Sequence, residues 1–519
     1  MSLEKDLACY RALMEKIYDY EHVLALLKFD SMTVMPPEGA YRRNRAIATI
    51  SEQLYAMQTG DELYEVTNSL YESLKDDSKL PSYLAYSIKE TKREFDELKD
   101  VPKELFLDLE SVKMEADASW KKARAAEDYS IFKDDLYKIA NLTAQVQSCK
   151  KSLKPGDDGI FDSLLSDCEP GMDTATYDRL FNDIKQELIP LIKEIMTKKR
   201  MRMGQLAIYG RNKIDRLSTN HTKHQEEEAQ NYLLKYIGFD FNKGTTSQGL
   251  HPFTMGFSHG DARFLNNFHE DDCIRSMFSS IHEGGHAIFW QNVNPEFDSL
   301  PADGCKYAAL NESQSRFFEN ILAHNIAFWE PIYDDISDIL PGLKAITLDE
   351  FNNIINNVKP TYIRTSADEL TYCLHIILRY EIEKEIFVNH ACVNDLEDMW
   401  NEKTKEYLGI VPPKPSLGIL QDMHWGNGLF GYFPTYLLGN VYDGMLLSAI
   451  ERDLGPVDDI LRNKEIGKIT KYLDENIHYY GNTKLPKDTL KDVCHEDLTA
   501  KQLINYYKKK YNKLYDLNV

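Results

Sequence analysis

Residues 273–293, CIRSMFSSIHEGGHAIFWQNV, space their apolar side chains three and four positions apart around the sequence HEGGH. This spacing predicts a helix, on which residues four apart project from the same face. His282 and His286 can therefore reach one divalent metal ion. Glu283 lies on the flank of that face, where its carboxylate can take a proton from a metal-activated water. The stretch predicts a hydrolytic metal centre on one apolar helix.

A chance match is the alternative explanation of HEGGH. The chain has 14 histidines, and in a chain of this composition the pattern arises by accident with a probability of roughly a few per cent. Gly284 and Gly285 make an accident less plausible, because together they cost about 2 kcal/mol of helix propensity relative to alanine. Two glycines inside a helix need a reason, such as the close approach of a substrate or a packed neighbour.

A catalytic zinc site usually has three protein ligands and a water, so a third ligand must come from another segment. Glu312 is the best candidate, because it begins the next predicted helix and a chain reversal would bring it beside the histidines. His324 is weaker, since it lies in an apolar stretch that is typical of a core histidine. Glu319 shares the helix face of Glu312 and could orient a ligand from behind. Three further histidines remain possible substrate contacts or ligands: His251, His259 and His424.

Helical periodicity covers most of the chain outside one segment. From residue 1 to about 235, apolar residues recur at helical spacing, with breaks at MPPEG, KLPSY, DVPKE and KPGDDG. Residues 238–268 are rich in Thr, Phe and Gly and predict a small antiparallel hairpin or sheet. A long helix is expected just after Pro360, and the Gly- and aromatic-rich stretch after PPKPS (412–416) suits a ligand-facing wall. The fold class is therefore mainly α, with a small antiparallel β element.

Composition narrows the possible functions. The net charge of −22 and the pI near 5.1 argue against a nucleic-acid partner or an anionic membrane surface, because phosphate binding needs clustered positive charge. No stretch approaches 18 uncharged apolar residues, and charges interrupt the N-terminal stretch every few residues, unlike in a signal peptide. The eight cysteines form no CxxC pair and are expected to be free thiols. We expect a cytoplasmic protein.

In six ordered motifs the chain resembles the thermostable carboxypeptidase Taq family of metallocarboxypeptidases. These motifs are HPF at 251–253, DAR at 261–263 against DxRxT, HEGGH at 282–286 against HExxH, ESQ at 312–314 against an HESxQ-like segment, IRTSAD at 363–368 against IRxxAD, and GILQDMHW at 418–425 against GxxQDxHW. Two positions depart from the pattern: Leu265 stands in place of Thr, and Asn311 in place of His. Neither is an inferred metal ligand, so the departures concern local substrate contacts and the hydrogen bonding around the ligands.

The resemblance implies more than the residues alone could predict. It implies one helical metallocarboxypeptidase domain over residues 1–519, with two helical halves flanking a deep substrate groove and catalytic motifs within 251–436. It implies the release of single C-terminal residues with broad specificity, one divalent metal that is zinc or alternatively cobalt, and a homodimer. From the residues alone, the prediction would end at a metal-dependent hydrolase.

A carboxypeptidase must recognise a terminal carboxylate, which an arginine guanidinium matches with two parallel hydrogen bonds. Arg364 is the candidate for this contact. The alternative is a surface ion pair with Asp368, four residues further along. Arg263 is a second candidate contact. Alternatively, it forms an ion pair with its neighbour Asp261 that only stabilises a hairpin.

The oxyanion that forms at the scissile carbonyl needs further hydrogen-bond donors. By resemblance, Tyr432 and Tyr436 in GYFPTY are the leading phenols, and His424 is a second donor. Alternatively, both tyrosines are ordinary aromatic wall with their hydroxyls satisfied elsewhere. His251 and Gln421 complete the candidate substrate contacts.

Two other functions remain open at this point. A related helical metallopeptidase could cut peptides internally or remove dipeptides, and it would not require the same free terminal carboxylate. A non-catalytic peptide-binding protein on a peptidase scaffold is a weaker alternative, because Glu283 is intact.

Overall fold

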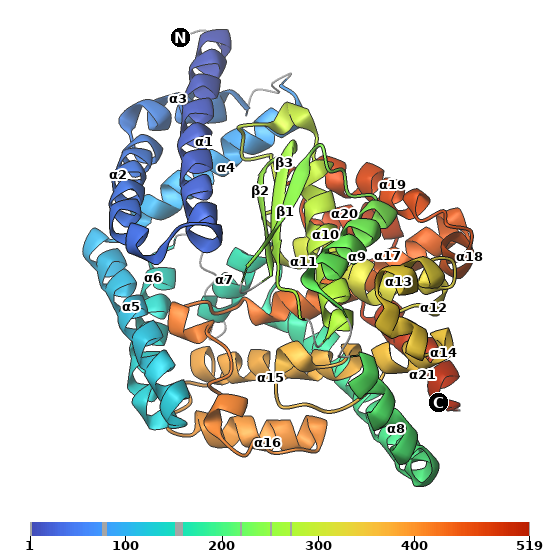
Figure 1. The fold of residues 1–519 in the computed structure, drawn as a ribbon. Helices are drawn as coiled ribbons and strands as arrows, with labels where there is room; N and C mark the ends of the chain where they lie inside the picture. The colour runs from blue at the N-terminus through green and yellow to red at the C-terminus, as the bar shows by residue number, and fades with distance from the viewer. Residues whose placement is uncertain are drawn as a thin grey trace.

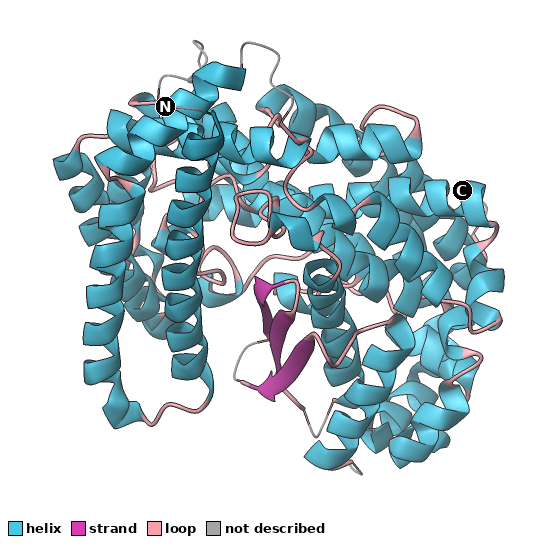
Figure 2. Ribbon diagram, turned by 90° about the horizontal axis from the view of Figure 1, so that it is seen from above, coloured by secondary structure: helices cyan, strands magenta, loops and turns pink. Residues whose placement is uncertain are grey.

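A computed structural model describes residues 3–74, 80–150, 159–217, 221–249, 252–269 and 272–517. Helices make up most of this part of the chain, and one small sheet lies among them (Figures 1 and 2). The mainly helical fold class is confirmed. In chain order the α-helices are α1 (Leu3–Thr33), α2 (Ala40–Gln58), α3 (Asp61–Ser73), α4 (Ser82–Asp100), α5 (Lys103–Ala126), α6 (Lys133–Ser148), α7 (Gly159–Cys168), α8 (Thr174–Leu217), α9 (Lys223–Ile237), α10 (Cys273–Gln291), α11 (Ala308–Arg316), α12 (Ile326–Trp329), α13 (Tyr333–Ile339), α14 (Leu348–Ile355), α15 (Glu369–Phe387), α16 (Leu396–Leu408), α17 (Phe433–Leu454), α18 (Val457–Arg462), α19 (Gly467–Asn476), α20 (Pro486–Cys494) and α21 (Lys501–Tyr515).

The sheet contains β1 (Gly244–Gln248), β2 (Phe253–Ser258) and β3 (Asp261–Asn266), in the order β1-β3-β2. β2 and β3 form the predicted antiparallel pair, but β1 runs parallel to β3. The predicted antiparallel hairpin is therefore present, and β1 adds a parallel strand that the sequence did not predict. β3 turns back beside β2 and leaves only its other edge open to β1. β1 runs opposite to β2, and β3 also runs opposite to β2. β1 and β3 therefore run in the same direction and pair as parallel strands.

The sheet separates α10 from α1 (Figure 1). On β3, Ala262 and Phe264 are fully buried and belong to the hydrophobic core with α10. On the opposite side, the ring of Phe29 from α1 packs edge-on against Phe253 and Phe257, with centroids 6.3 Å and 6.0 Å apart. The small sheet therefore links the N-terminal helices to the helix that carries HEGGH.

Gly284 and Gly285 allow the neighbours of α10 to approach closely. A Cβ atom on Gly285 would lie 2.7 Å from the backbone of Gln314 and Ser315 on α11. A Cβ atom on Gly284 would lie 2.6 Å from the Leu234 side chain on α9. The glycines thus have a packing reason, which is one of the two reasons that the sequence suggested.

The α15 helix begins later than predicted. Residues 361–367 form an extended segment with one short turn at Arg364–Ser366, and the helix starts at Glu369. Asp368 caps it, because its side chain accepts hydrogen bonds from the backbone N–H groups of Leu370 and Thr371. Because the segment before this cap is not part of the helix, Arg364 can face the loop at 418–425.

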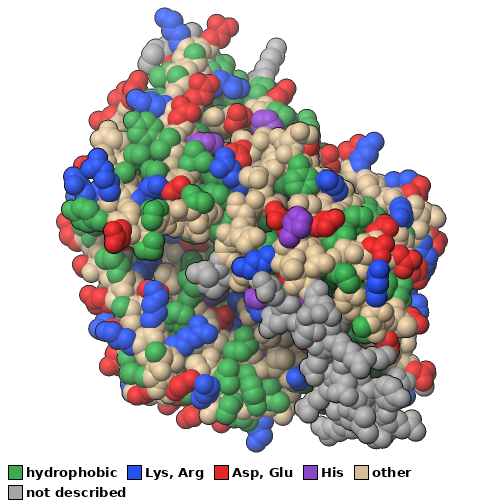
Figure 3. All heavy atoms as spheres, in the orientation of Figure 1, with side chains coloured by type: hydrophobic (Ala, Val, Ile, Leu, Met, Phe, Trp, Pro, Cys, Tyr) green, Lys and Arg blue, Asp and Glu red, His purple; other side chains and the backbone are tan. Residues whose placement is uncertain are grey.

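All eight cysteines are unpaired, as predicted. Within the described ranges, no helix is both long enough and apolar enough to cross a membrane. On the face shown in Figure 3, lysine and arginine side chains are interspersed with aspartate and glutamate.

Candidate active site

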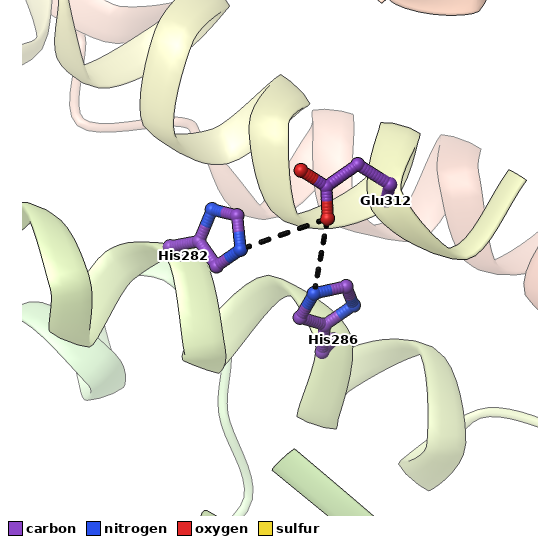
Figure 4. A group of neighbouring side chains, drawn as sticks. All are labelled: His282, His286 and Glu312. Carbon is purple, nitrogen blue, oxygen red and sulfur yellow. Dashed lines mark ion pairs between the residues drawn. The ribbon is translucent and has the colours of Figure 1, made fainter. Parts of the chain in front are cut away.

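The two histidines of HEGGH and Glu312 converge across the α10–α11 contact (Figure 4). The Nε2 atoms of His282 and His286 lie 3.8 Å and 3.6 Å from Oε2 of Glu312. The three candidate ligand atoms all lie within 4.8 Å of one another. Among the described residues, this is the one group of three or more His, Cys, Asp and Glu side chains placed closely enough to share a metal ion.

Both imidazoles are oriented from behind by hydrogen bonds. The Nδ1–H of His282 donates to Oε2 of Glu319 at 2.8 Å, and the Nδ1–H of His286 donates to Oδ1 of Asn311 at 2.8 Å. Each ring therefore presents Nε2 to Glu312, which is the usual arrangement of histidine ligands. Asn311 performs this role at one of the two positions where the chain departs from the resembled pattern.

The electrostatics of the group favour a cation. Burial lowers the pKa of His282, but Glu319 and Glu312 outweigh it and raise this pKa to about 9. Burial raises the pKa of Glu312, but His286, His282 and Arg316 outweigh it and lower this pKa to about 2. The carboxylates that hold a proton on His282 would equally stabilise a divalent metal ion.

The distances between the candidate ligand atoms are compatible with a four-coordinate metal ion. Ligand bonds of about 2.0–2.2 Å in a tetrahedral arrangement place neighbouring donor atoms roughly 3.4 Å apart. The observed separations of 3.6 Å and 3.8 Å are close to this value. Two imidazole nitrogens and one carboxylate oxygen also match the donor chemistry of catalytic zinc sites.

Glu283 is held by the sheet. It is buried, and its Oε2 accepts a hydrogen bond at 2.6 Å from the hydroxyl of Thr254 on β2. Thr254 directly follows the HPF motif at residues 251–253. The sequence reasoning missed Thr254, because a threonine in a strand has no distinctive signal.

Arg316 is a second residue that the sequence reasoning missed. Its Nη1 lies 3.6 Å from Oε1 of Glu312, the oxygen that does not face the histidines. Its guanidinium also lies over the ring of Tyr372, 4.2 Å from the centroid. The helical spacing of four residues after Glu312 could have suggested this contact.

Arg364 is buried, and it does not pair with Asp368. Its Nη2 and Nε donate to Oδ1 of Asp422 at 3.1 Å and 3.3 Å, and its Nη1 donates to the hydroxyl of Tyr372 at 3.2 Å. Asp368 instead caps α15 and accepts from the backbone N–H of Lys359. The alternative of a surface ion pair with Asp368 was therefore wrong.

One carboxylate serves two buried arginines at this position. Oδ2 of Asp422 accepts from Nε of Arg379 at 2.7 Å, while Oδ1 faces Arg364. Burial raises the pKa of Asp422, but the charges of Arg379 and Arg364 outweigh it and hold the pKa below its usual value. Two positive charges against one negative charge leave the cluster positive, which favours binding of an anionic group.

The three candidate oxyanion donors lie together beside Arg364. The ring centroid of His424 lies 6.0 Å from that of Tyr432 and 6.3 Å from that of Tyr436. The guanidinium carbon of Arg364 lies 5.0 Å from the centroid of the Tyr436 ring. Burial lowers the pKa of His424 to about 4 and raises that of Tyr432 to about 12; it also raises that of Tyr436. All three side chains are therefore uncharged near neutral pH.

The remaining candidates are distributed around this centre. His251 lies outside the described residues. Gln421 accepts from the backbone N–H of Arg364 and donates to the carbonyls of Tyr362 and Gly418. The amide of Gln421 thus supports the Arg364 segment.

Arg263 lies on the opposite face of the sheet from α10. It pairs with Asp261 at 2.6 Å, and its guanidinium lies 4.7 Å from the ring centroid of Phe257. It also lines a pocket of about 790 Å³ between α1 and the sheet, together with Asp30, Thr246 and Gln248.

Two other histidines that the sequence raised have no contact with the candidate ligands. His324 contacts the ring of Phe278, and its Nδ1–H donates to the carbonyl of Glu319 at 2.9 Å, as expected of a core histidine. His259 lies in the turn between β2 and β3.

Comparison with known proteins gives one consistent result. A family model described as "Carboxypeptidase Taq (M32) metallopeptidase" matches residues 10–511. The chain is 35% identical to carboxypeptidase 1 of Bacillus subtilis over 97% of each protein, and 30% identical to thermostable carboxypeptidase 1 of Thermus thermophilus over 95% of each.

Solved structures show the same fold. The M32 carboxypeptidase from Deinococcus radiodurans superposes with a TM-score of 0.91 at 25% identity, covering 99% of this chain and 100% of that one. The metallocarboxypeptidase 1 of Trypanosoma cruzi superposes with a TM-score of 0.88 at 28% identity, covering 98% and 99%.

Proposed function

The chain belongs to the carboxypeptidase Taq (M32) family of metallopeptidases and is a metal-dependent carboxypeptidase that acts on peptides, and from this premise we propose which of its residues carry the reaction. The observation that carries the proposal is the convergence of His282, His286 and Glu312 beside Glu283. A positive arginine cluster lies on the same wall, linked to Glu312 through Arg316 and Tyr372.

We propose that His282, His286 and Glu312 hold the metal, and that it is zinc, with cobalt as the alternative. The donor set of two imidazoles and one carboxylate supports this choice. When bound, the ion would polarise the scissile carbonyl and lower the pKa of the attacking water. Glu319 and Asn311 would keep the two rings in the orientation that binding requires.

Glu283 acts as the general base and then as the general acid. Its carboxylate takes a proton from the attacking water and later gives it to the leaving amine. Thr254 holds Oε2 of this carboxylate, so the other oxygen is the one that exchanges the proton. This division of the two oxygens keeps the base in one orientation through both transfers.

Arg364 recognises the terminal carboxylate of the peptide. Its guanidinium is buried, and it belongs to a cluster whose net charge is positive. Tyr436 lies against it, and Tyr432 and His424 lie next to Tyr436. As uncharged donors, these three side chains would stabilise the oxyanion without competing for the substrate carboxylate.

The other predicted contacts take secondary roles. Gln421 holds the backbone of Arg364 rather than the substrate. Arg263 contacts residues of the peptide further from its C-terminus, because it lines the pocket beside α1. His251 remains a predicted substrate contact.

The test compares N-blocked peptides with a free C-terminal acid or a C-terminal amide, with products followed by mass. The wild-type enzyme should remove single residues from the acid only, lose activity on chelation and regain it with zinc. Arg364→Gln should lower kcat/KM for the acid by about 100-fold or more and abolish the preference for acid over amide. Arg263→Gln is the matched control and should keep that preference.

The opposite outcomes are informative as well. Retained preference for the acid in Arg364→Gln would contradict the assignment of Arg364. Internal cleavage or release of dipeptides would contradict the proposal that the enzyme removes single C-terminal residues. Recovery with cobalt but not zinc would reverse the choice of metal.

We also propose a single catalytic unit over residues 1–519, a homodimer and a cytoplasmic location. The family resemblance supports the first two, and the unpaired cysteines fit a reducing compartment. Sedimentation at micromolar concentration tests the dimer, which a monomer at that concentration would contradict.

A further inference from the structure

A stripe of buried polar side chains runs along α15. It consists of Tyr372, His375, Arg379 and Glu383, spaced three or four residues apart on one face. The first three bond to segments that carry Arg364 or Asp422. Glu383 bonds instead to the loop that follows His424, and no part of the proposed reaction uses it.

Glu383 connects to both ends of the loop at 425–431. It is fully buried, its Oε1 accepts from the indole N–H of Trp425 at 2.7 Å, and its Oε2 accepts from the backbone N–H of Gly431 at 2.8 Å. His424 directly precedes the first anchor, and Tyr432 directly follows the second. One carboxyl group therefore bonds to the side chain of the residue after His424 and to the backbone of the residue before Tyr432.

The loop between these anchors depends on such a fixed frame. Gly428 and Gly431 have φ angles of +71° and +75°, which a side chain would disfavour. A Cβ atom on Gly431 would also lie 2.7 Å from the backbone of Leu164 on α7. Phe430 packs on Phe387 of α15 with ring centroids 4.9 Å apart, which holds the loop in place without setting its orientation. Backbone bonds such as that from the N–H of Leu429 to the carbonyl of His424 shape the loop, and the two bonds to Glu383 tie both of its ends to α15.

We propose that Glu383 is a positioning residue for the carboxypeptidase reaction, which acts by holding the 425–431 loop so that His424 and Tyr432 point at the oxyanion. This inference rests on the roles proposed above for those two side chains. A carboxyl group accepts hydrogen bonds at both oxygens whether or not it is protonated, whereas an amide accepts at one only. Replacement by glutamine therefore breaks one anchor and leaves two donors facing each other.

The first experiment compares Glu383→Gln with Glu381→Gln, both as zinc-loaded full-length enzymes. Glu381 is a matched control, because it lies on the same helix but bonds to Lys185, Lys403 and Tyr407, away from the loop. We expect Glu383→Gln to lower kcat by about 10- to 100-fold, since small misplacements of catalytic groups have effects of this size. KM should change by less than about three-fold, because oxyanion donors act in the transition state. Zinc content should stay close to that of the control, since Glu383 does not contact the proposed ligands.

A double-variant cycle shows whether Glu383 acts through the loop. In a Tyr432→Phe or a His424→Leu background, Glu383→Gln should cost less than it does in the wild type. Costs that are unchanged in both backgrounds would overturn the proposal, as would a wild-type kcat for Glu383→Gln. If Tyr432→Phe and His424→Leu each keep full activity, the oxyanion roles themselves fail, which the single variants reveal without Glu383.

A second variant covers the case in which Glu383→Gln does not fold. Trp425→Phe keeps an aromatic ring and removes the N–H that donates to Glu383. It should lower kcat in the same direction and leave KM within about three-fold. Adding Glu383→Gln to Trp425→Phe should cost little more, because the glutamine amide then no longer opposes an indole N–H. Unchanged kcat in Trp425→Phe would overturn the proposal.

Discussion

Asn311 stands where the resembled motif has a histidine, and it carries one of the two hydrogen bonds that orient the proposed metal ligands. Its side-chain oxygen accepts from His286 at 2.8 Å, while the carboxylate of Glu319 accepts from His282. The two histidines are therefore supported differently, one by a neutral amide and one by a negative charge. A neutral acceptor fixes the ring without strengthening its basicity as much as a carboxylate does.

Asn311→Ala should weaken zinc binding by about 10- to 100-fold, because His286 loses the acceptor that fixes its tautomer and orientation. Competition with a chelator of known affinity measures this change. Asn311→Asp should retain or increase the affinity, since a carboxylate still accepts the same hydrogen bond. Asn292→Ala, at the end of the same α10 helix, is the control, because its amide bonds to the carbonyl of Ile288 in its own helix. Equal affinity in Asn311→Ala and the control would contradict this role.

Glu283→Gln should lower kcat by about 10²- to 10⁴-fold, because an amide cannot accept the proton of the attacking water. Zinc content should not change, since Glu283 is not a proposed ligand, and both quantities can be measured on one preparation. Thr254→Val should produce a smaller loss of kcat by freeing the carboxylate, whereas Thr254→Ser keeps the hydroxyl and should stay near wild type. Full activity of Glu283→Gln would reject the mechanism.

At the scale of elements, the contact between α10 and α11 decides whether the proposed metal ligands meet. Gly285 faces backbone atoms of α11, which cannot move without moving Glu312, whereas Gly284 faces the end of the Leu234 side chain. The two adjacent glycines therefore meet neighbours of very different stiffness. This difference gives a matched pair of substitutions within one helix.

Gly285→Ala should lower the free energy of unfolding by about 1–3 kcal/mol through overpacking, despite a gain of about 1 kcal/mol in helix propensity. It should also weaken zinc binding, because a wider helix separation moves Glu312 from the histidines. Gly284→Ala should cost less, since a leucine side chain can shift. Chemical denaturation and chelator competition measure the two effects. A Gly285→Ala protein as stable and as tight in zinc binding as Gly284→Ala would show that the close backbone approach is unimportant.

Local spacing predicted the parts of the site that lie within one element. His282, Glu283 and His286 follow from the period of a helix, and the cap at Asp272 is present where the helix was expected to begin. Glu312 followed from the need for a third ligand and from a chain reversal. The parallel pairing of β1, the start of α15 and the contact of Thr254 could not be predicted in this way. Each depends on which distant segments pack together, and residue types alone do not encode that.

At the scale of the whole molecule, the chain is strongly negative, but positive side chains are concentrated inside the candidate site. The chain has a net charge of −22, yet Arg316, Arg364 and Arg379 are buried along one wall of the site. Asp422 is the carboxylate that holds two of these arginines, and it joins the loop at 418–425 to α15. The interior site can therefore attract a substrate carboxylate although the exterior as a whole repels anions.

The dependence of stability on pH tests this buried cluster. In the folded protein the pKa of Asp422 is lowered, because the charges of Arg379 and Arg364 outweigh burial. Such a group stabilises the fold fully above the unfolded pKa of about 3.9, and this contribution is lost as the pH falls toward the folded pKa. Asp422→Asn should therefore lower the free energy of unfolding by about 3–5 kcal/mol, since it leaves buried arginines unpaired.

The difference between wild type and Asp422→Asn, measured by urea denaturation, should stay constant from pH 8 to about pH 5 and shrink only below about pH 4. Asp453→Asn is the control. Its hydrogen bonds with Arg452 and Tyr472 lower the pKa of Asp453 to about 2, but the carboxylate is exposed to solvent, so its removal should have a small effect that added salt reduces. A difference for Asp422→Asn that already shrinks between pH 8 and pH 5 would mean that other groups stabilise the cluster. The assignment of Arg364 as the carboxylate receptor would then lose its electrostatic basis.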